Sequence, residues 1–355
     1  MSESKPDPEE TRKPESEEEA PANKAQGLGK PTDTKTATVR TAAGLALLVV
    51  LVAVFAYVAF YRGTASYYAR RITSGNEAAR REAAQKLSEL GEDAAPAIPQ
   101  LVKALDDEMP AVRMPVSMLL REMDAMAEEA VPHLAEMLRT GSSTGQGLAM
   151  DVLISYREKA TGAIPTLIEM VETRQDEMQR RAMSALAAIA PNDDRVVSAI
   201  FDALGHTVQA ARSGAAQVFA GIAQRNRDAY EMLQGGLREK EGVALRGAIS
   251  AAAQMGSAAG ESVSRLIEIA RTADTPTRTA ALSALVSIAP AEERIVAPAV
   301  QAARSDDEDL RSAGVNALAG MAVANPRGRE AIRELLPSLE GEEREALEAA
   351  LPDEE

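Results

Sequence analysis

The sequence contains no cysteine and no tryptophan, and only 3% of its 355 residues are aromatic. The absence of cysteine excludes a Cys/His catalytic set, and it is compatible with an oxidising compartment without requiring one. The only histidines, His133 and His206, complete no Ser/His/Asp set, and there is no H-E-x-x-H motif or clustered metal-ligand spacing. The GLGK run at 27–30 is no phosphate loop because no strand precedes it. We therefore predict no catalytic residue, cofactor, metal site or small-molecule substrate.

Repetition at a period of 33 residues is what the sequence has in abundance. Two series of apolar residues keep this spacing over about 230 residues, and a fixed period of this size is typical of a solenoid. The first series is Ile98, Val131, Ile164, Val197, Tyr230, Val263 and Val296, with Leu101, Leu134, Leu167, Ile200, Leu233, Leu266 and Ala299 three residues later. The second is Leu87, Leu120, Leu153, Leu186, Phe219, Ala252, Leu285 and Leu318, with Ala83, Val116, Ala149, Ala182, Ala215, Ala248, Ala281 and Gly314 four residues earlier.

Each repeat is predicted to be a pair of helices. Residues 98–105 and 112–120 both place apolar side chains at the spacing of one helical face. Asp106, Asp107 and Pro110 between them are expected to end the first helix and cap the second. Such a pair cannot bury both of its apolar faces alone, so stacked neighbours must supply a continuous core.

A resemblance to a known repeat follows from these residues. The T-P-L-H-x-A run of ankyrin repeats and the tryptophan of tetratricopeptide repeats are missing. The stretch LGEDAAPAIPQLVKALDDEMPAVR at 90–113 instead resembles the short HEAT-like repeat, of the kind found in phycobilisome-lyase-type proteins. The resemblance covers 76–351 and implies an all-α, right-handed α-solenoid of HEAT-like helix pairs. It says little about activity, because HEAT arrays have many unrelated roles.

The chain before the repeats is different in composition. Residues 1–40 hold seven basic and nine acidic residues and no aromatic one, which predicts a disordered tail. Residues 41–61 carry no charge, and a helix of this length spans roughly 30 Å, the thickness of a hydrocarbon core. We therefore predict one transmembrane helix at 41–61; a cleaved signal peptide is the alternative, although one rarely follows so long an acidic tail. Residues 62–75 are expected to form a juxtamembrane helix or linker, and 352–355 an acidic end.

The membrane orientation cannot be read from the charges. Three basic residues flank the apolar stretch on each side, so the positive-inside rule is tied. We expect a single-pass protein with the tail in the cytoplasm and the repeats outside it, because a short tail usually stays where it was made.

The excess of acidic residues limits the kinds of partner that the chain can bind. Beyond residue 40 the chain has 32 basic and 45 acidic residues, which argues against nucleic acid and against an array lying flat on anionic lipid. The final pair of helices ends in EGEEREALEAALPDEE, which we interpret as a capping unit with a polar outer face, an acidic partner-binding tip being the alternative.

One position of the repeat holds arginine in five units. Because stacking should align these residues in a row, two readings remain open: each arginine pairs with acids of the turns, such as Asp107 or Asp307, or the row forms a docking edge together with Met114 and Met118. The candidate partner-binding residues are Arg113, Met114, Met118, Arg212, Arg278 and Arg311, and Arg80 occupies the same position.

Two units depart from the pattern, and both lie in a methionine-rich stretch. Ten of the 14 methionines fall between Met109 and Met183, where they are adaptable core filler, a soft binding surface or, less simply, thioether ligands of Cu(I). Pro115 should kink its helix, and residues 141–147 (GSSTGQG) are expected to form an enlarged turn.

The combined prediction is a membrane-anchored scaffold that binds a protein partner on the solenoid surface, with the second helices lining its concave side. An enzyme or maturation factor of the lyase-like HEAT branch is the alternative that the resemblance implies.

Overall fold

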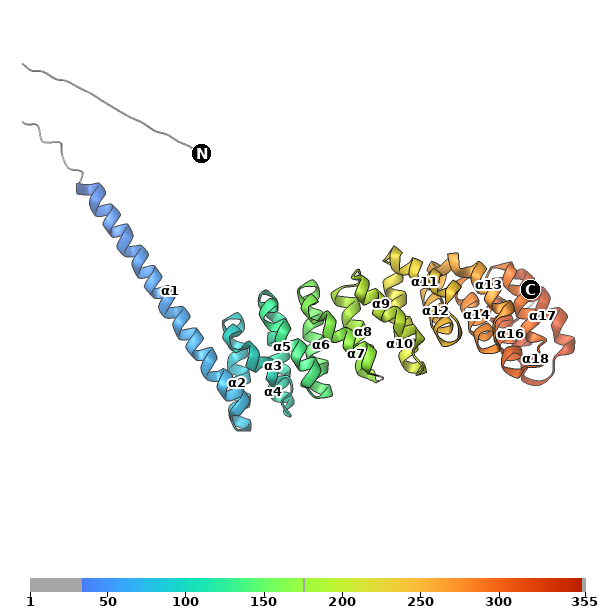
Figure 1. The fold of residues 1–355 in the computed structure, drawn as a ribbon, viewed down its shortest axis with the longest axis horizontal. Coiled ribbons are helices and arrows are strands. Elements are labelled where there is room, and N and C mark those ends of the chain that lie inside the picture. Colours follow the sequence, from blue (N-terminus) through green and yellow to red (C-terminus); the bar gives the residue numbers. More distant parts are fainter. Residues whose placement is uncertain (1–33, 175, 353–355) are drawn as a thin grey trace, which may run out of the picture. The chain divides into compact units, whose positions relative to one another are not determined.

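The computed structural model describes the backbone of residues 34–174 and 176–352, with side chains from residue 46 onward except at 58, 59, 61 and 62. The chain divides into two units, Met1–Tyr57 and Val58–Glu355. All regular elements within these described ranges are helices (Figure 1).

The first unit contains the beginning of α1 (Thr34–Ser74). Its described side chains, from 46 to 57, are all exposed, including Leu48, Val52 and Phe55. In the part of the chain that was searched, the structure offers no helix that is long and apolar enough to cross a membrane. Several side chains of the predicted span at 41–61 lie outside the described residues. Residues 1–33 of the predicted tail at 1–40 lie outside them as well. Both therefore stay predictions.

The second unit is a stack of helix pairs. Each second-type helix packs against the next, so that the pairs from α2 to α18 lie side by side in one row (Figure 1). The first-type helices are α3 (Ile98–Ala104), α5 (Ala127–Thr140), α7 (Ile164–Thr173), α9 (Asp194–Asp202), α11 (Arg227–Glu239), α13 (Val263–Thr272), α15 (Val296–Ala303) and α17 (Pro326–Leu335). The second-type helices are α2 (Glu77–Leu90), α4 (Pro110–Glu122), α6 (Ser143–Tyr156), α8 (Glu177–Ile189), α10 (Gln209–Ala223), α12 (Gly242–Met255), α14 (Thr275–Ile288), α16 (Glu308–Met321) and α18 (Gly341–Ala350).

Short 3-10 helices join many of these elements. Most lead from a second-type helix into the first-type helix that follows it. They are η1 (Gly91–Ala97), η2 (Asp124–Met126), η3 (Arg157–Ala163), η4 (Ala203–Gly205), η5 (Gly256–Ser262), η6 (Glu293–Ile295) and η7 (Leu336–Ser338). The predicted all-α solenoid of helix pairs is confirmed; its handedness and the concave position of the second helices stay predictions.

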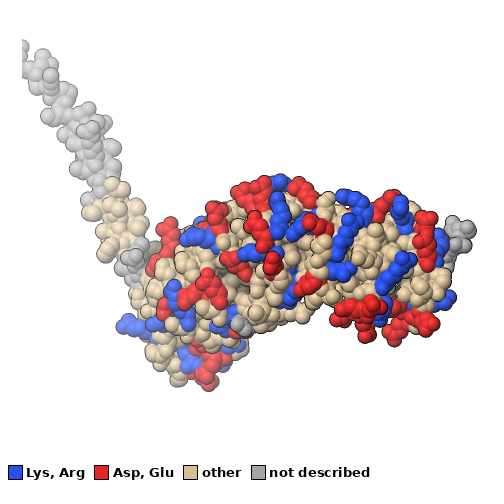
Figure 2. Space-filling model, turned by 45° about the vertical axis from the view of Figure 1, so that its right-hand side comes forward, with Lys and Arg blue, Asp and Glu red and all other residues tan. Residues whose placement is uncertain are grey.

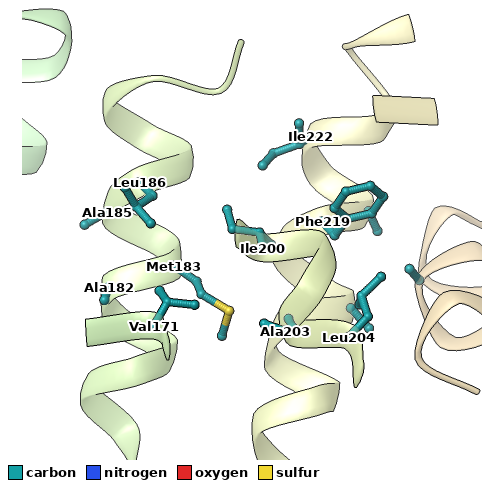
Figure 3. Close-up of a cluster of buried hydrophobic side chains, with 14 of the residues drawn as sticks. Val171, Ala182, Met183, Ala185, Leu186, Ile200, Ala203, Leu204, Phe219 and Ile222 are labelled. Atoms are coloured by element: carbon teal, nitrogen blue, oxygen red, sulfur yellow. The ribbon is translucent and has the colours of Figure 1, made fainter. Parts of the chain in front are cut away.

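The core consists of the repeated apolar residues. Every member of the predicted series is buried, and the series that begins at Leu101 is fully buried in each unit. Figure 3 shows how neighbouring units share this core: Leu186 of α8, Ile200 of α9 and Phe219 of α10 contribute to one apolar cluster. Phe219 also packs against Phe201 with ring centroids 5.2 Å apart. Each unit therefore depends on its neighbour to remove its apolar side chains from water.

The end of α1 supplies the first helix of the array. Ala65, Ala69 and Ile72 are buried, and they precede Ile98, Val102 and Leu105 by one period of 33 residues. Residues 62–75, expected as a juxtamembrane helix or linker, thus include a first-type helix paired with α2. The sequence pattern concealed this, because two of the three core positions hold alanine.

Aspartate side chains cap some of the second-type helices, but not α4. Asp176 and Asp307 cap α8 and α16 with their side chains. In α4 the cap is Met109, whose N–H donates to Asp107, while Asp106 accepts the backbone N–H of Ser142, 3.1 Å away in the next unit. The prediction that Asp106 and Asp107 cap their own second helix is therefore wrong.

The predicted turn at 141–147 is also wrong in extent. Gly141 ends α5, Ser142 caps α6, and the remaining residues form the first turns of that helix. A Cβ at Gly145 would lie 2.7 Å from the Asp106 carboxylate, and one at Gly147 would collide with the guanidinium of Arg181. The glycines thus admit side chains of both neighbouring units. By contrast, α4 continues through Pro115 as one helix.

One residue has an unfavourable backbone conformation. Arg157 ends α6 with φ 51° and ψ −130°, and it is the one non-glycine residue with positive φ in the described chain. Gly91 and Gly256 occupy the same place two and three periods away, with φ 57° and 56°. Such a conformation costs a non-glycine residue about 1–3 kcal/mol.

The buried series makes a prediction about stability. Leu186→Ala should lower the free energy of unfolding by about 2–5 kcal/mol, because the cavity lies between two units. Chemical denaturation measures this loss, and hydrogen exchange should place it in the middle units. Met118→Ala removes a comparable side chain that is 59% exposed, so it should cost little. An equal loss in both variants would contradict the assigned core.

Candidate functional site

The five arginines at one repeat position hold the turn of each helix pair. Nη1 of Arg113 donates to the carbonyl oxygens of Asp107 (3.1 Å) and Glu108 (2.9 Å). Arg212 and Arg311 bond the carbonyls of their own turns in the same way. These bonds satisfy carbonyls at and after the end of the first-type helix, where intrahelical donors are missing.

Two of these arginines also connect neighbouring units. Nε of Arg80 lies 2.9 Å from the Asp107 carboxylate of the next turn, and Nε of Arg311 donates to Glu343 at 3.0 Å. Within the described residues Arg113 pairs with no carboxylate, so the reading in which each arginine pairs with acids of the turns does not hold for it; backbone carbonyls take their place. The structure thus gives the row a role in holding the turns, and its role as a docking edge stays a prediction.

Glutamine replaces arginine at this position in two units. The amide nitrogen of Gln146 donates to the carbonyl of Leu138 at 2.9 Å, and that of Gln179 donates to the carbonyl of Val171 at 2.7 Å. Arg278 makes the equivalent bond to Ala270 at 3.0 Å. A neutral amide donor can thus serve this position, so a positive charge is not essential there, and α12 has Leu245 at the same position.

Met114 and Met118 are the exposed methionines of the methionine-rich stretch. They are 49% and 59% exposed and lie one turn apart on α4, which places them on one face. Met123, Met150 and Met183 are buried in the core, as the reading of methionine as core filler predicts. For Met118 that reading is wrong, because its side chain points away from the apolar series.

The exposed face of α4 lacks charge over its first three turns. It carries Ala111, Met114, Pro115 and Met118, of which only Pro115 is half-buried. Pro115 has no N–H, so the carbonyl of Ala111 receives no hydrogen bond from it. At the equivalent positions of α16, one finds Ser312 and Asn316 instead. Among the described second-type helices, α4 therefore has an unusual apolar surface.

The grooves between first-type helices are lined by charges of both signs. In the groove between α11 and α13, of about 840 Å³, Arg227 pairs with Glu231 (3.1 Å) and Glu261 (3.3 Å), and Arg265 pairs with Glu268 (2.7 Å). Basic and acidic side chains are likewise interspersed over the face seen in Figure 2. These grooves offer no largely apolar pocket of the kind that small ligands favour.

A smaller groove lies where α4, α6 and α8 end. It measures about 560 Å³ and is lined by Asp124, Ser155, Tyr156, Arg157, Glu158, Lys159, Ala188, Ile189 and Pro191. The Tyr156 hydroxyl donates to the carbonyl of Leu120 at 2.5 Å and so fixes the end of α6 against α4. Burial, with a smaller effect of the Asp124 charge, raises the pKa of Tyr156 well above its ordinary value. The Tyr156 hydroxyl is therefore neutral and held in place.

The histidines show no sign of a shared site. His133 is exposed on α5, and His206 is half-buried in the turn before α10, where its Nδ1 accepts the N–H of Val208 at 3.1 Å. Within the described residues, no three His, Cys, Asp or Glu side chains gather closely enough to hold a metal ion.

Comparison with known proteins identifies the repeat in part of the chain. Residues 68–153, from the last turns of α1 into α6, match the family described as HEAT repeats. No curated protein matches the chain.

Solved structures match the chain at low sequence identity, and three of them have the following coverage and TM-scores. An engineered protein is 19% identical, with 81% of this chain and 87% of that chain covered and a TM-score of 0.34. She4p is 9% identical, with 81% and 55% covered and a TM-score of 0.34. The karyopherin Kap121p, bound to the SUMO protease Ulp1p, is 10% identical, with 77% and 39% covered and a TM-score of 0.46.

The turn-holding arginines generate a prediction. Arg113→Leu should lower the free energy of unfolding by about 0.5–1.5 kcal/mol, because one part-buried and one exposed carbonyl lose their donor. Arg113→Gln should retain most of that stability, as glutamine serves the position in two other units. Thermal unfolding compares the variants. If Arg113→Glu leaves the melting temperature unchanged but abolishes partner binding, the row is a docking edge instead.

Proposed function

We propose that the protein is a scaffold that binds a protein partner through the exposed face of α4 and is tethered to a membrane by residues 41–61. The observation that carries the binding site is the pair Met114 and Met118, two large apolar side chains that are half exposed or more. Solenoids commonly present one continuous helix face to their partners, and residues 68–153, which include α4, match HEAT repeats.

Methionine at both positions favours a protein partner over a rigid small ligand. Its unbranched, polarisable side chain adapts to apolar groups of different shapes, which is useful on an interaction surface. Neighbouring Ala111 and Pro115 are small or half-buried, so a partner helix can approach the backbone of α4 closely. The lyase-like alternative rests on the resemblance of the repeat alone.

The tether rests on the residues before the array. The 21 residues at 41–61 carry no charge, and the described ones from 46 to 57 leave their side chains exposed all around the helix. An exposed, uniformly apolar helix is favourable when lipid surrounds it. We place the tail in the cytoplasm and the repeats on the opposite side of the membrane.

The binding face is tested by a double variant. Met114→Gln/Met118→Gln should leave the free energy of unfolding within about 0.5 kcal/mol, because both side chains are exposed. The same variant should lose the partner that the full chain captures from solubilised membranes, once that partner is identified by mass spectrometry and its affinity measured with purified protein. The matched control is Ser312→Gln/Asn316→Gln, which changes the equivalent positions of α16. Equal affinity of the double variant and the control would disprove the site.

The tether is tested by deletion. Removing 41–61 should move the protein from the membrane pellet to the soluble fraction while its far-UV circular dichroism keeps the helical signal of 76–351. Removing 5–25 from the tail, a deletion of equal length, should not release it. A deletion of 41–61 that remains in the pellet after a carbonate wash would refute the tether.

A further inference from the structure

The strained backbone at Arg157 lowers the stability of the folded chain, so we ask which function of the side chain offsets this cost. Glycine adopts the same φ without strain in two other units, at Gly91 and Gly256, so the fold does not require a side chain there. Strain of this kind persists where function uses it, and the inference runs from the observed outlier to a role. Arginine makes the folded chain less stable than glycine would at this position. We therefore look for the role in the guanidinium group, which glycine lacks.

The guanidinium of Arg157 lines the groove at the ends of α4, α6 and α8. Arg157 is exposed at the end of α6. Within the described residues its guanidinium makes no hydrogen bond and no ion pair. The other cation of the groove, Lys159, already pairs with Asp124. Arg157 is thus the cation of this groove that is free to bind an anion.

The groove begins beyond the end of α4, and the exposed residues Arg121 and Glu122 lie between it and Met118 in the sequence. Met118 lies one turn before Glu122, the last residue of α4, and Asp124 at the groove wall follows two residues later. The Tyr156 hydroxyl, bonded to Leu120, holds the two surfaces together. A partner segment lying on Met114 and Met118 can therefore extend beyond the end of α4 to Arg157.

We propose that Arg157 binds a carboxylate of the partner segment, which carries apolar residues one turn apart for Met114 and Met118 and an acidic residue beyond them. This inference rests on the proposed binding face and adds the chemistry of the partner. A guanidinium binds a carboxylate through two parallel hydrogen bonds, a geometry that lysine cannot reproduce. Glu158 stands beside Arg157 in the groove and competes with that carboxylate.

The experiment uses the full chain in lipid nanodiscs and a displayed library of random peptides of about four helical turns. Selection should enrich peptides with two apolar residues three or four positions apart, followed by Asp or Glu. The affinity of one selected peptide is then measured for the unchanged chain and for its variants, together with their melting temperatures.

Arg157→Gly should raise the melting temperature by several degrees and weaken peptide binding about tenfold, the equivalent of one lost charge-assisted pair. Arg157→Lys should bind less tightly than arginine, and Glu158→Gln should bind more tightly. A peptide with Asn or Gln in place of its acid should lose the same factor with the unchanged chain and nothing further with Arg157→Gly.

Two outcomes separate this inference from the proposed function. If Arg157→Gly binds the peptide as tightly as the unchanged chain while Met114→Gln/Met118→Gln does not, the face of α4 stands and the role of Arg157 is refuted. If the selected peptides lack an acid, the role of Arg157 is refuted as well. If binding is indifferent to both methionines, the proposed face itself fails and the role of Arg157 fails with it.

Discussion

The array depends on the burial of apolar side chains between consecutive helix pairs. A pair such as α7 and α8 has an apolar residue on each face that it turns toward its neighbours, and neither face can be covered from within the pair. The fully buried positions that begin at Leu101 recur in every unit, so the junctions are chemically alike from one end to the other. The polar features are arranged around these junctions: arginines hold the turns, carboxylates cap helices, and glycines make room for side chains of the next unit.

Because the apolar contacts between helix pairs are alike in every unit, the exposed residues of each unit can vary. The core positions of α4 and α16 are equivalent, yet the exposed positions hold methionines in one and Ser312 and Asn316 in the other. A surface change of this kind costs the array little stability, because the buried series carries the fold. The binding face that we propose on α4 is therefore a local property of one unit on a scaffold that the other units support.

The sequence predicted those parts of the structure that follow from the position of a residue within the repeat. The apolar series and the helix pairs could be read from spacing alone, and the end of α1 was missed only because Ala65 and Ala69 give a weak signal. The extent of the turn at 141–147 could not be read, because Gly145 sits in a helix to accommodate Asp106 of another unit. Such contacts become visible only once the units are stacked.

The candidate site was predictable to a similar degree. The pair Met114 and Met118 was named from the sequence. That both side chains point away from the core became clear only from the way α4 is rotated about its axis in the array. Arg157 was missed, although a signal existed: it occupies the register position of Gly91 and Gly256. Alanine holds the same position in four other units, so the sequence pattern is weak and the dihedral angles are needed to show the strain.

The bonds between units have a consequence for how the chain is made. The backbone N–H of Ser142 donates to Asp106, the Tyr156 hydroxyl to the carbonyl of Leu120, and Arg181 to Asp151. In each case the partners are about one period apart. A chain whose contacts are this local avoids the slow closure of long loops. Each new pair of helices can dock on the pair that left the ribosome just before it, so the array can grow in the order of its synthesis. The end of α1, which supplies the first helix of the stack, would then be the template on which this growth begins.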